Sequence, residues 1–409
     1  MSIIYVTGRV KNPAVQLSFL DVIYNRTVEP KGSKMRTRTD RYMMDETNPK
    51  IPALSQNLID GAESVYYPWT QALKEFNSKW ERFIETEDKM ELYHTFWIPK
   101  GSKVPENERE VKWRDPHDSR FRRIDAPNDD FKEAFYDLKE IFERRFKVLY
   151  HTSAYAYVKG RCVYDAVKRH QQNESRWFLK LDFSNFFGSV TPEFIENMFS
   201  IIYPYGYLFK YHEDFKNEFL KALSICFLNG GLPQGTPMSP LLTNVIMIPI
   251  DSEIARGLWH KNKDFVYTRY ADDLLVSSKY DFKWNEIQDY LFKILEVMKA
   301  PMVLNREKTR YGSSSGRNWN LGLMLNKDGD ITIGHKKKKM FKVSMNNFLT
   351  DYLNGNYWSL HDVQVFNGQM QWYLSVEKES ISKIVSNYDA KYGTNTKEII
   401  KKYLKGEVR

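Results

Sequence analysis

The sequence predicts an α+β fold, because short β-prone runs alternate with amphipathic helices along its middle and a helical segment follows them. The clearest β-prone runs are residues 177–183 and 266–278, and the second is broken by a polar turn. The clearest helical stripe lies between Trp284 and Met298, where apolar residues recur every three or four positions before Pro301. Runs joined by such a turn are typical of antiparallel strands.

Length and composition fit a globular protein of two or three packed units. The chain has 409 residues, of which 28% are charged and 42% hydrophobic, and Lys and Arg exceed Asp and Glu by nine. That excess suits a polyanion partner, although many soluble proteins carry a similar charge. Two cysteines, Cys162 and Cys226, are too few for a disulfide framework or a zinc site.

No targeting or membrane segment is evident in the sequence. The first residues lack the long apolar core of a signal peptide, and no run reaches the roughly 18 apolar residues of a membrane span. We therefore expect a cytoplasmic protein with no membrane partner.

The first half of the chain is expected to be mostly helical, with one hairpin. Residues 1–90 form a mostly helical N-terminal extension, with a helix from Pro68 to Phe83. The next elements are two short strands separated by a charged loop, and then a helix, at residues 95–100, 121–124 and 129–146.

The second half is predicted from its capping residues and turns. Ser239 and Pro240 open a helix that Pro249 kinks or ends. A hairpin follows, with strands at residues 320–325 and 331–334. From residue 336 to 409 the chain has helical character, beginning with a run of lysines. That run is either a solvated helix start or a contact for a nucleic-acid backbone.

The most informative residues for function are acidic. Asp272 and Asp273 sit at a turn, where such a pair is either an ordinary surface turn or a site for a divalent cation. Asp182 ends the run 177–183, so it can face them from an adjacent strand. Between these sites, a Gly- and Pro-rich loop at residues 230–240 leaves backbone N–H groups and Gln234 to line a pocket.

This order of motifs resembles the reverse transcriptases. Asp182 is similar to the first palm carboxylate, residues 232–235 to the nucleotide-pocket motif and residues 270–273 to the signature turn. Further stretches resemble the fingers hairpin, a later palm motif and the primer-gripping hairpin, at residues 95–100, 121–127, 305–310 and 320–324. The resemblance implies a right-hand polymerase with fingers and an antiparallel palm sheet at 91–335, and a helical domain at 336–409 in place of the thumb.

The resemblance also implies two-metal nucleotidyl transfer. Two Mg²⁺ ions, with Mn²⁺ as a substitute, are expected to stabilise the attacking and leaving oxygens. Asp182 and Asp272 would bridge both ions, Asp273 would have a weaker role, and the carbonyl of Phe183 would complete the coordination. The three aspartates are the expected catalytic residues.

Six residues are expected to bind the incoming dNTP, and Phe183, whose carbonyl completes the metal coordination, is one of them. Lys100 and Arg122 match the fingers residues that hold the β- and γ-phosphates; the alternative is two solvated hairpin charges. Phe187 matches an aromatic gate against the ribose 2′-OH, or is a core residue. Gln234 would rest against the nucleotide. Lys308 matches a lysine proposed to protonate the leaving pyrophosphate.

The flanking segments favour one branch of this family. Retron enzymes carry Asn-Ala-x-x-His in the fingers, whereas residues 165–170 here differ from that motif, and His170 is expected to be structural. Retron enzymes also carry Val-Thr-Gly after the palm, whereas the Val-Thr-Gly of this chain is at residues 6–8, before the fingers. Residues 366–373 resemble the tail of bacterial abortive-infection and defence reverse transcriptases, within the retron-like superfamily. Too few residues follow the palm for an RNase H, endonuclease or integrase domain.

That resemblance implies a phage-defence DNA polymerase of the bacterial cytoplasm. It would add dNTPs without a template from a tyrosine of the protein, leave the DNA product covalently attached, and form a homo-oligomer, a trimer or a hexamer. The alternative is a retron-type synthase that copies an RNA template into cDNA. A third hypothesis is a polymerase-like scaffold that only binds nucleic acid.

Overall fold

The computed structural model describes residues 56–100, 120–314, 322–326 and 328–408, which form two compact units. The first unit holds the described residues up to Tyr157, with residues 183–261 and 285–305. The second holds residues 158–182 and 262–284 and the described residues from 306 onward. The predicted domain division at residues 90 and 335 stays a prediction.

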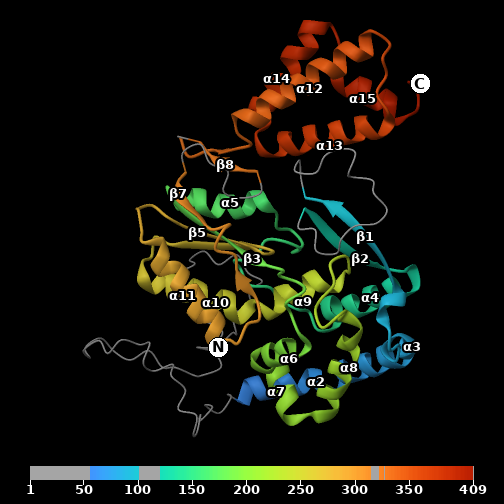
Figure 1. The fold of residues 1–409 in the computed structure, drawn as a ribbon, viewed down its shortest axis with the longest axis vertical. Coiled ribbons are helices and arrows are strands. Elements are labelled where there is room, and N and C mark those ends of the chain that lie inside the picture. Colours follow the sequence, from blue (N-terminus) through green and yellow to red (C-terminus); the bar gives the residue numbers. More distant parts are fainter. Residues whose placement is uncertain (1–55, 101–119, 315–321, 327, 409) are drawn as a thin grey trace. The chain divides into compact units, whose positions relative to one another are not determined.

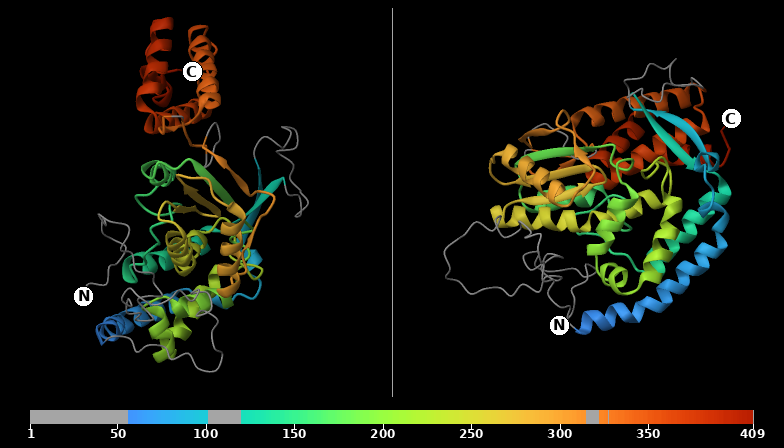
Figure 2. Two further views of the ribbon diagram at one scale, coloured as in Figure 1. Left: turned by 90° about the vertical axis from the view of Figure 1, so that its left-hand side faces the viewer. Right: turned by 60° about the horizontal axis from the view of Figure 1, so that its bottom comes forward.

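The first unit begins with a long helix. Helix α2, Gln56–Lys79, starts well before Pro68, the predicted first residue. Leu58, upstream of the proline, is buried together with Trp69 and Leu73, so packing on both sides of Pro68 continues the helix despite the lost hydrogen bond. Helices α7 and α8, Tyr205–Tyr211 and Glu213–Leu223, run beside it (Figures 1 and 2).

Helix α4, Asp129–Glu140, confirms the helix predicted after the hairpin. The side chain of Asn128 caps it by accepting from the backbone N–H of Phe131 at 2.9 Å. The helix continues into one π-helical turn, Ile141–Arg145, which accounts for the predicted length to residue 146. Its buried face carries Phe131 and Phe135.

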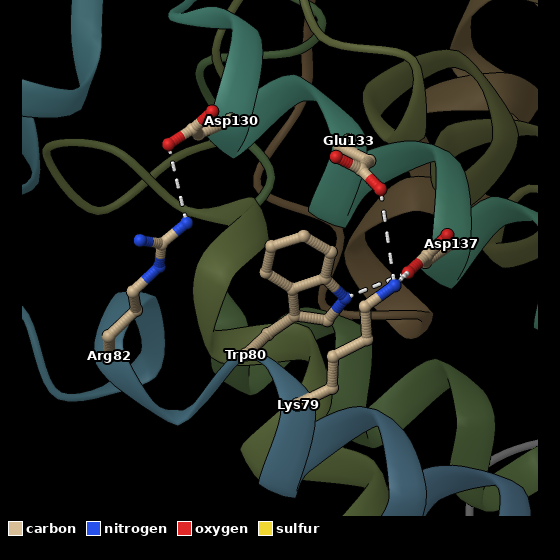
Figure 3. Close-up of polar contacts among 6 residues, drawn as sticks. All are labelled: Lys79, Trp80, Arg82, Asp130, Glu133 and Asp137. Carbon is tan, nitrogen blue, oxygen red and sulfur yellow. Dashed lines mark hydrogen bonds and ion pairs between the residues drawn. The ribbon is translucent and has the colours of Figure 1, made fainter.

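Polar contacts tie α4 to the end of α2 and to α3, Glu81–Ile84 (Figure 3). The Asp137 carboxylate accepts from Lys79 Nζ at 2.7 Å and from the indole N–H of Trp80 at 3.0 Å. Arg82 reaches Asp130 at 3.4 Å. Because these groups are largely solvated, the ion pairs add little stability, and the buried aromatic residues hold the helices together.

The predicted hairpin is formed by β1, Tyr93–Pro99, and β2, Phe121–Pro127. The strands are antiparallel, with Tyr93 opposite Pro127 and Pro99 opposite Phe121. The remaining elements of this unit are the 3₁₀ turns Lys89–Leu92 and Ser224–Cys226, α6 (Pro192–Ile201), α9 (Met238–Ile246), α10 (Ile248–Lys261), α11 (Trp284–Val297, whose first residue belongs to the second unit) and β6 (Val303–Leu304).

Helix α9 begins one residue before the predicted cap. Ser239 lies inside the helix, and its hydroxyl donates to the carbonyl of Pro233 at 2.7 Å instead of capping the helix end. The helix is interrupted at Met247, between α9 and α10 and two residues before Pro249, as the proline predicts.

The second unit contains an antiparallel sheet. Strand β3, Trp177–Ser184, lies between β5, Asp273–Ser278, and β7, Arg310–Ser313, and β4, Val266–Tyr270, pairs with the outer edge of β5. The last two residues of β3 pair with β6. Helix α5, Val163–Gln172, contacts β4. This sheet and the helices around it confirm the predicted α+β class.

A small hairpin and four helices complete this unit. The hairpin consists of β8, Met324–Leu325, and β9, Ile331–Thr332, at the predicted place. The helices, grouped together in Figures 1 and 2, are α12 (His335–Leu353), α13 (Leu360–Val376), α14 (Lys378–Tyr392) and α15 (Thr396–Leu404). No helix in the described part of the chain is both long and apolar enough to span a bilayer.

One buried apolar cluster joins these helices to the sheet. It includes Phe178 of β3, Leu275 of β5 and Val167 of α5, together with side chains of the hairpin and of all four C-terminal helices. Phe178 and Leu275 lie on the same face of the sheet as Asp182, because alternate residues of a strand share a face and Lys180 is opposite Leu275. The face of the sheet that this cluster covers is therefore the face that carries the acidic residue.

Candidate active site

A two-residue turn joins β4 to β5 and carries the acidic pair. Tyr270 pairs with Asp273, which leaves Ala271 and Asp272 as the turn residues, and Ala271 has a left-handed φ of 56°. Arg269, fully buried on β4, donates from Nη1 to the carbonyl oxygen of Ala271 at 3.2 Å. A buried guanidinium therefore supports the backbone of the turn, a role that the sequence alone did not indicate.

The sheet register places Asp182 directly opposite Asp273 on neighbouring strands. Residues paired in this way point to the same face, with Cβ atoms about 4.5–5.5 Å apart. Both side chains are nearly buried, at 10% and 15% exposure. The structure thus brings two carboxylates together where the sequence predicted a meeting of acids, and it places Asp272 in the adjoining turn.

Each of these two carboxylates is paired with a lysine. Lys308 Nζ lies 2.6 Å from Asp182 Oδ2, and Lys180 Nζ lies 2.8 Å from Asp273 Oδ2. Burial raises the pKa of Asp273, the ammonium of Lys180 opposes that rise, and the neighbouring carboxylate of Asp182 adds to it. Lys180 was not predicted, although its position two residues before Asp182 placed it on the same face of the strand.

The donor set is suited to a hard divalent cation. Asp182 and Asp273 offer closely spaced carboxylate oxygens, which are the ligands that Mg²⁺ and Mn²⁺ prefer. Within the residues that the structure describes, no group of three or more His, Cys, Asp or Glu side chains is gathered closely enough to hold a metal ion. Asp182 and Asp273 offer two carboxylates to such an ion, and Asp272 lies in the adjoining turn.

A buried histidine supports the two strands of the acidic turn. His170 of α5 is fully buried, with Nε2 2.8 Å from Thr268 Oγ1 on β4 and Nδ1 2.6 Å from Ser277 Oγ on β5. Burial lowers the pKa of His170 to about 3, so the ring is neutral at physiological pH. His170 is therefore structural, as predicted.

In the first unit, the Leu-Pro-Gln-Gly loop lies against β2. The backbone N–H of Asp125 donates to the carbonyl of Gln234 at 2.8 Å. Gly235 has a φ of 125°, and a Cβ there would lie only 2.7 Å from the carbonyl oxygen of Asp125. The glycine is therefore required by both its backbone conformation and the close approach of β2.

The same loop also contacts the predicted gate residue. The backbone N–H of Leu232 donates to the carbonyl of Phe187 at 3.2 Å. The Phe187 ring is half-buried, 6.5 Å from the exposed ring of Tyr157 and 5.5 Å from that of Phe186. Phe183 is buried and stacked on Phe186 at 5.3 Å. Phe187 and the Gln234 loop are thus neighbours, as a shared pocket requires.

The two arginines of β2 point to opposite faces, as the strand geometry predicts. Arg123 Nε donates to Asp125 Oδ1 at 2.9 Å, and this carboxylate also accepts from Thr95 Oγ1 at 2.7 Å. Arg122 is exposed, and so is Lys100, whose backbone N–H donates to the carbonyl of Arg120 at 2.8 Å. Arg123 has a structural partner on β2, which leaves Arg122 as the arginine placed on the other face.

The sheet, the acidic turn and the loop motifs together define a palm-type polymerase. The chain belongs to the reverse transcriptase (RNA-dependent DNA polymerase) family, whose model matches residues 108–348, more than half of the chain. It is an RNA-directed DNA polymerase-type nucleotidyltransferase of the bacterial, retron-like kind.

Curated relatives support this membership. The chain is 26% identical over 296 residues to the retron Ec83 reverse transcriptase of Escherichia coli, covering 70% of this chain and 87% of the relative. The retron Ec73 and Ec86 enzymes of the same organism are 27% and 26% identical over 203 and 226 residues, or 49% and 54% of this chain. This chain spans a little under two thirds of those two relatives, 63% of each.

Solved structures with some likeness include telomerases. Apo telomerase of Candida tropicalis aligns over 65% of this chain and 57% of its own, with 14% identity and a TM-score of 0.38. A form truncated from its C-terminal domain aligns over 52% of each chain, with 16% identity and a TM-score of 0.37. Scores this low add nothing to the assignment, which rests on the family and on the sheet.

Proposed function

We propose that this chain is a retron-type reverse transcriptase that copies an RNA template into DNA. The observation that carries the proposal is the pair Asp182 and Asp273, face to face on adjacent antiparallel strands beside a two-residue turn. Membership of the family and the retron relatives support the choice of template-directed synthesis over the alternatives.

The acidic residues would hold the metal ions of the reaction. When bound, a pair of Mg²⁺ or Mn²⁺ ions supplies charge stabilisation for the attacking and leaving oxygens of an in-line displacement. Asp182, Asp272 and the carbonyl of Phe183 would hold them, with Asp273 in a lesser role. Carboxylates this close repel one another, so a cation would relieve a cost that the lysines only partly offset.

Residues of the first unit would bind the incoming nucleotide. Exposed Arg122 and Lys100 would hold the β- and γ-phosphates, the arginine through its planar fork and the lysine as a point charge. Phe187 would exclude a ribose 2′-OH, and Gln234 would rest against the nucleotide. The support for these two is their adjacency through the Leu232–Phe187 hydrogen bond.

Lys308 would donate a proton to the leaving pyrophosphate. Its ammonium already lies at Asp182, and its side chain is 62% exposed, so an approaching leaving group can reach it. The balance of the step is simple. The primer hydroxyl gives its proton to solvent and attacks the α-phosphorus, the bond from that phosphorus to the pyrophosphate oxygen breaks, and Lys308 would give a proton to the departing oxygen and regain one from solvent.

The relatives favour the retron-type alternative over the phage-defence interpretation. Abortive infection, priming from a tyrosine, untemplated synthesis, a trimer or hexamer, and a bacterial cytoplasmic location stay predictions that rest on the sequence resemblance. The priming tyrosine is not identified by any motif among the 26 tyrosines of the chain.

The decisive experiment is to sequence the DNA that purifies with the full chain and to analyse how it is attached. We expect DNA complementary to one defined RNA, made only with a divalent cation and dNTPs. Random sequence linked to a tyrosine would instead support the defence interpretation. Bound RNA with no dNTP incorporation under any condition would support the scaffold hypothesis.

A further inference from the structure

Lys180 is placed to hold Asp273 from within the sheet. It lies on β3, opposite Leu275 of β5 and Arg310 of β7, two residues before Asp182 and on the same face. Asp273 is its diagonal neighbour on β5, at a separation of roughly 7–8 Å between backbones that a lysine side chain can bridge. The 2.8 Å ion pair shows that it does so.

The environment of Lys180 makes this ion pair difficult to break. The side chains of Lys180 and Asp273 are only 23% and 15% exposed. On the same face of the sheet, Phe178 precedes Lys180, and Leu275, directly opposite, belongs to the same buried apolar cluster. Separating the pair would leave a nearly buried carboxylate and a nearly buried ammonium uncompensated, which is strongly unfavourable.

The second ion pair of the site has the opposite character. Lys308 follows β6 and precedes β7, in a turn closed by a hydrogen bond from Thr309 N–H to the carbonyl of Arg306. Its side chain is mostly in solvent, so its ammonium can be rehydrated on leaving Asp182, and a cation bound at Asp182 would compensate the charge of that nearly buried carboxylate. The two lysines have similar distances to their carboxylates but differ in how easily they can be displaced.

We propose that Lys180 is a positioning residue that keeps Asp273 anchored to β3 whether or not a divalent cation is bound, whereas Lys308 leaves Asp182 when the cation binds. The proposal rests on the proposed function, because it requires the cation to bind at Asp182. It assigns Asp273 its lesser role by a physical cause: the carboxylate is already engaged by a fixed internal cation. Asp182 becomes available to the metal ion when the mobile ammonium of Lys308 leaves it.

Lysine acetylation of the wild-type chain, followed by mass spectrometry, tests the proposal directly. Mn²⁺ is the probe, and its binding is measured separately by electron paramagnetic resonance. We expect Mn²⁺ to raise the acetylation rate of Lys308 about threefold or more as its ion pair opens, and to leave that of Lys180 unchanged. Lys279, which forms a solvated pair with Glu174 in the same unit, is the internal reference.

The outcomes separate this proposal from the proposed function. If Mn²⁺ binds and Lys180 becomes as reactive as Lys308, the proposal is wrong and the polymerase function stands. If Mn²⁺ binds and neither lysine changes, the exchange at Asp182 is refuted. If Mn²⁺ does not bind at all, the metal site itself fails, and the proposed function fails with it.

Variants test whether Lys180 acts through Asp273. A displaced catalytic group costs up to about 100-fold, so we expect Lys180→Met to lower kcat by about 10–100-fold while KM for dNTP and Mn²⁺ affinity change little. Lys180→Arg, which keeps the charge, should recover most of kcat, and Lys279→Met should behave as wild type. Unchanged kcat in a folded Lys180→Met chain would overturn the proposal. If that variant does not fold, the wild-type acetylation result decides.

Discussion

Arg269 and Ala271 are joined by a hydrogen bond from a fully buried guanidinium to the carbonyl oxygen of a left-handed turn residue, 3.2 Å away. A non-glycine residue in that conformation costs about 1–2 kcal/mol, and the bond offsets part of it. The backbone that presents Asp272 is therefore held from beneath by a side chain of the preceding strand.

Replacing this arginine should loosen the turn. Arg269→Lys cannot reproduce the planar fork, so we expect a loss of about 1–3 kcal/mol in the free energy of unfolding, measured by urea denaturation. Arg176→Lys, an exposed arginine of the same unit, should stay within about 0.5 kcal/mol of wild type. Equal effects of the two changes would contradict a special role for Arg269.

The acidic residues should be required for catalysis and not for folding. Asp182→Asn and Asp272→Asn should each lower Mg²⁺-dependent dNTP incorporation by at least about 100-fold, because the charge that would hold the metal is lost. Circular dichroism should show a folded protein. Asp328→Asn, in the exposed turn between β8 and β9, is the control and should keep full activity.

The buried histidine makes stability depend on pH. The pKa of His170 is about 3 in the folded chain, against an ordinary value of 6.5. Between these values only the unfolded chain binds the extra proton. The stabilisation is therefore complete above pH 6.5 and is lost as pH falls toward 3, at up to about 1.4 kcal/mol per pH unit.

Thermal unfolding across that pH range tests the assignment. His170→Gln removes the titrating group, so its stability should depend less on pH than that of wild type, although it is lower at neutral pH. His361→Gln, an exposed histidine of the same unit, should retain the wild-type pH dependence. An identical pH dependence of His170→Gln and wild type would show that other groups dominate.

Phe187→Ala distinguishes an aromatic gate from a core residue. If Phe187 is a gate, Phe187→Ala should discriminate against ribonucleotides at least about 10-fold less than wild type, since steric exclusion of the 2′-OH is lost. The measurement is the ratio of kcat/KM for dNTP and rNTP, so a general loss of activity cancels. An unchanged ratio with lower thermal stability would identify Phe187 as a packing residue.

Gly235→Ala should be far more disruptive than the same change at Gly230, five residues earlier in the chain. At Gly235 the new Cβ would meet the backbone of Asp125, whereas at Gly230, with a φ of 79°, nothing lies within 4 Å. We expect Gly230→Ala to cost about 1 kcal/mol of unfolding free energy from backbone strain alone, and Gly235→Ala clearly more. Equal costs would mean that the loop moves away from β2 freely.

Much of the fold followed from local patterns in the sequence. The acidic hairpin, the hairpin at residues 93–127 and the break before Pro249 were predictable, because turn chemistry and alternation act over a few residues. The start of α2 was not, since tertiary packing of Leu58 overrides the usual effect of a proline.

The acidic residues of the candidate site could be predicted from the sequence, whereas the basic side chains that support them could not. Motif order identified Asp182 and the turn, and the strand register then selected Asp273 as the direct partner of Asp182. Lys180 and Arg269 were missed because an exposed and a buried cation look alike in sequence. Their roles depend on which strands are neighbours, and that is a property of the tertiary fold.

The apolar cluster that contains Phe178 and Leu275 has a consequence for how the protein melts. These two side chains flank Lys180 on the acidic face of the sheet and share their core with the four C-terminal helices. Removing the four C-terminal helices would open this core to water, so these helices and strands β3 and β5 should unfold in a single cooperative step. A fusion partner or truncation that loosens the last helices would thereby disturb carboxylates that those helices need not touch.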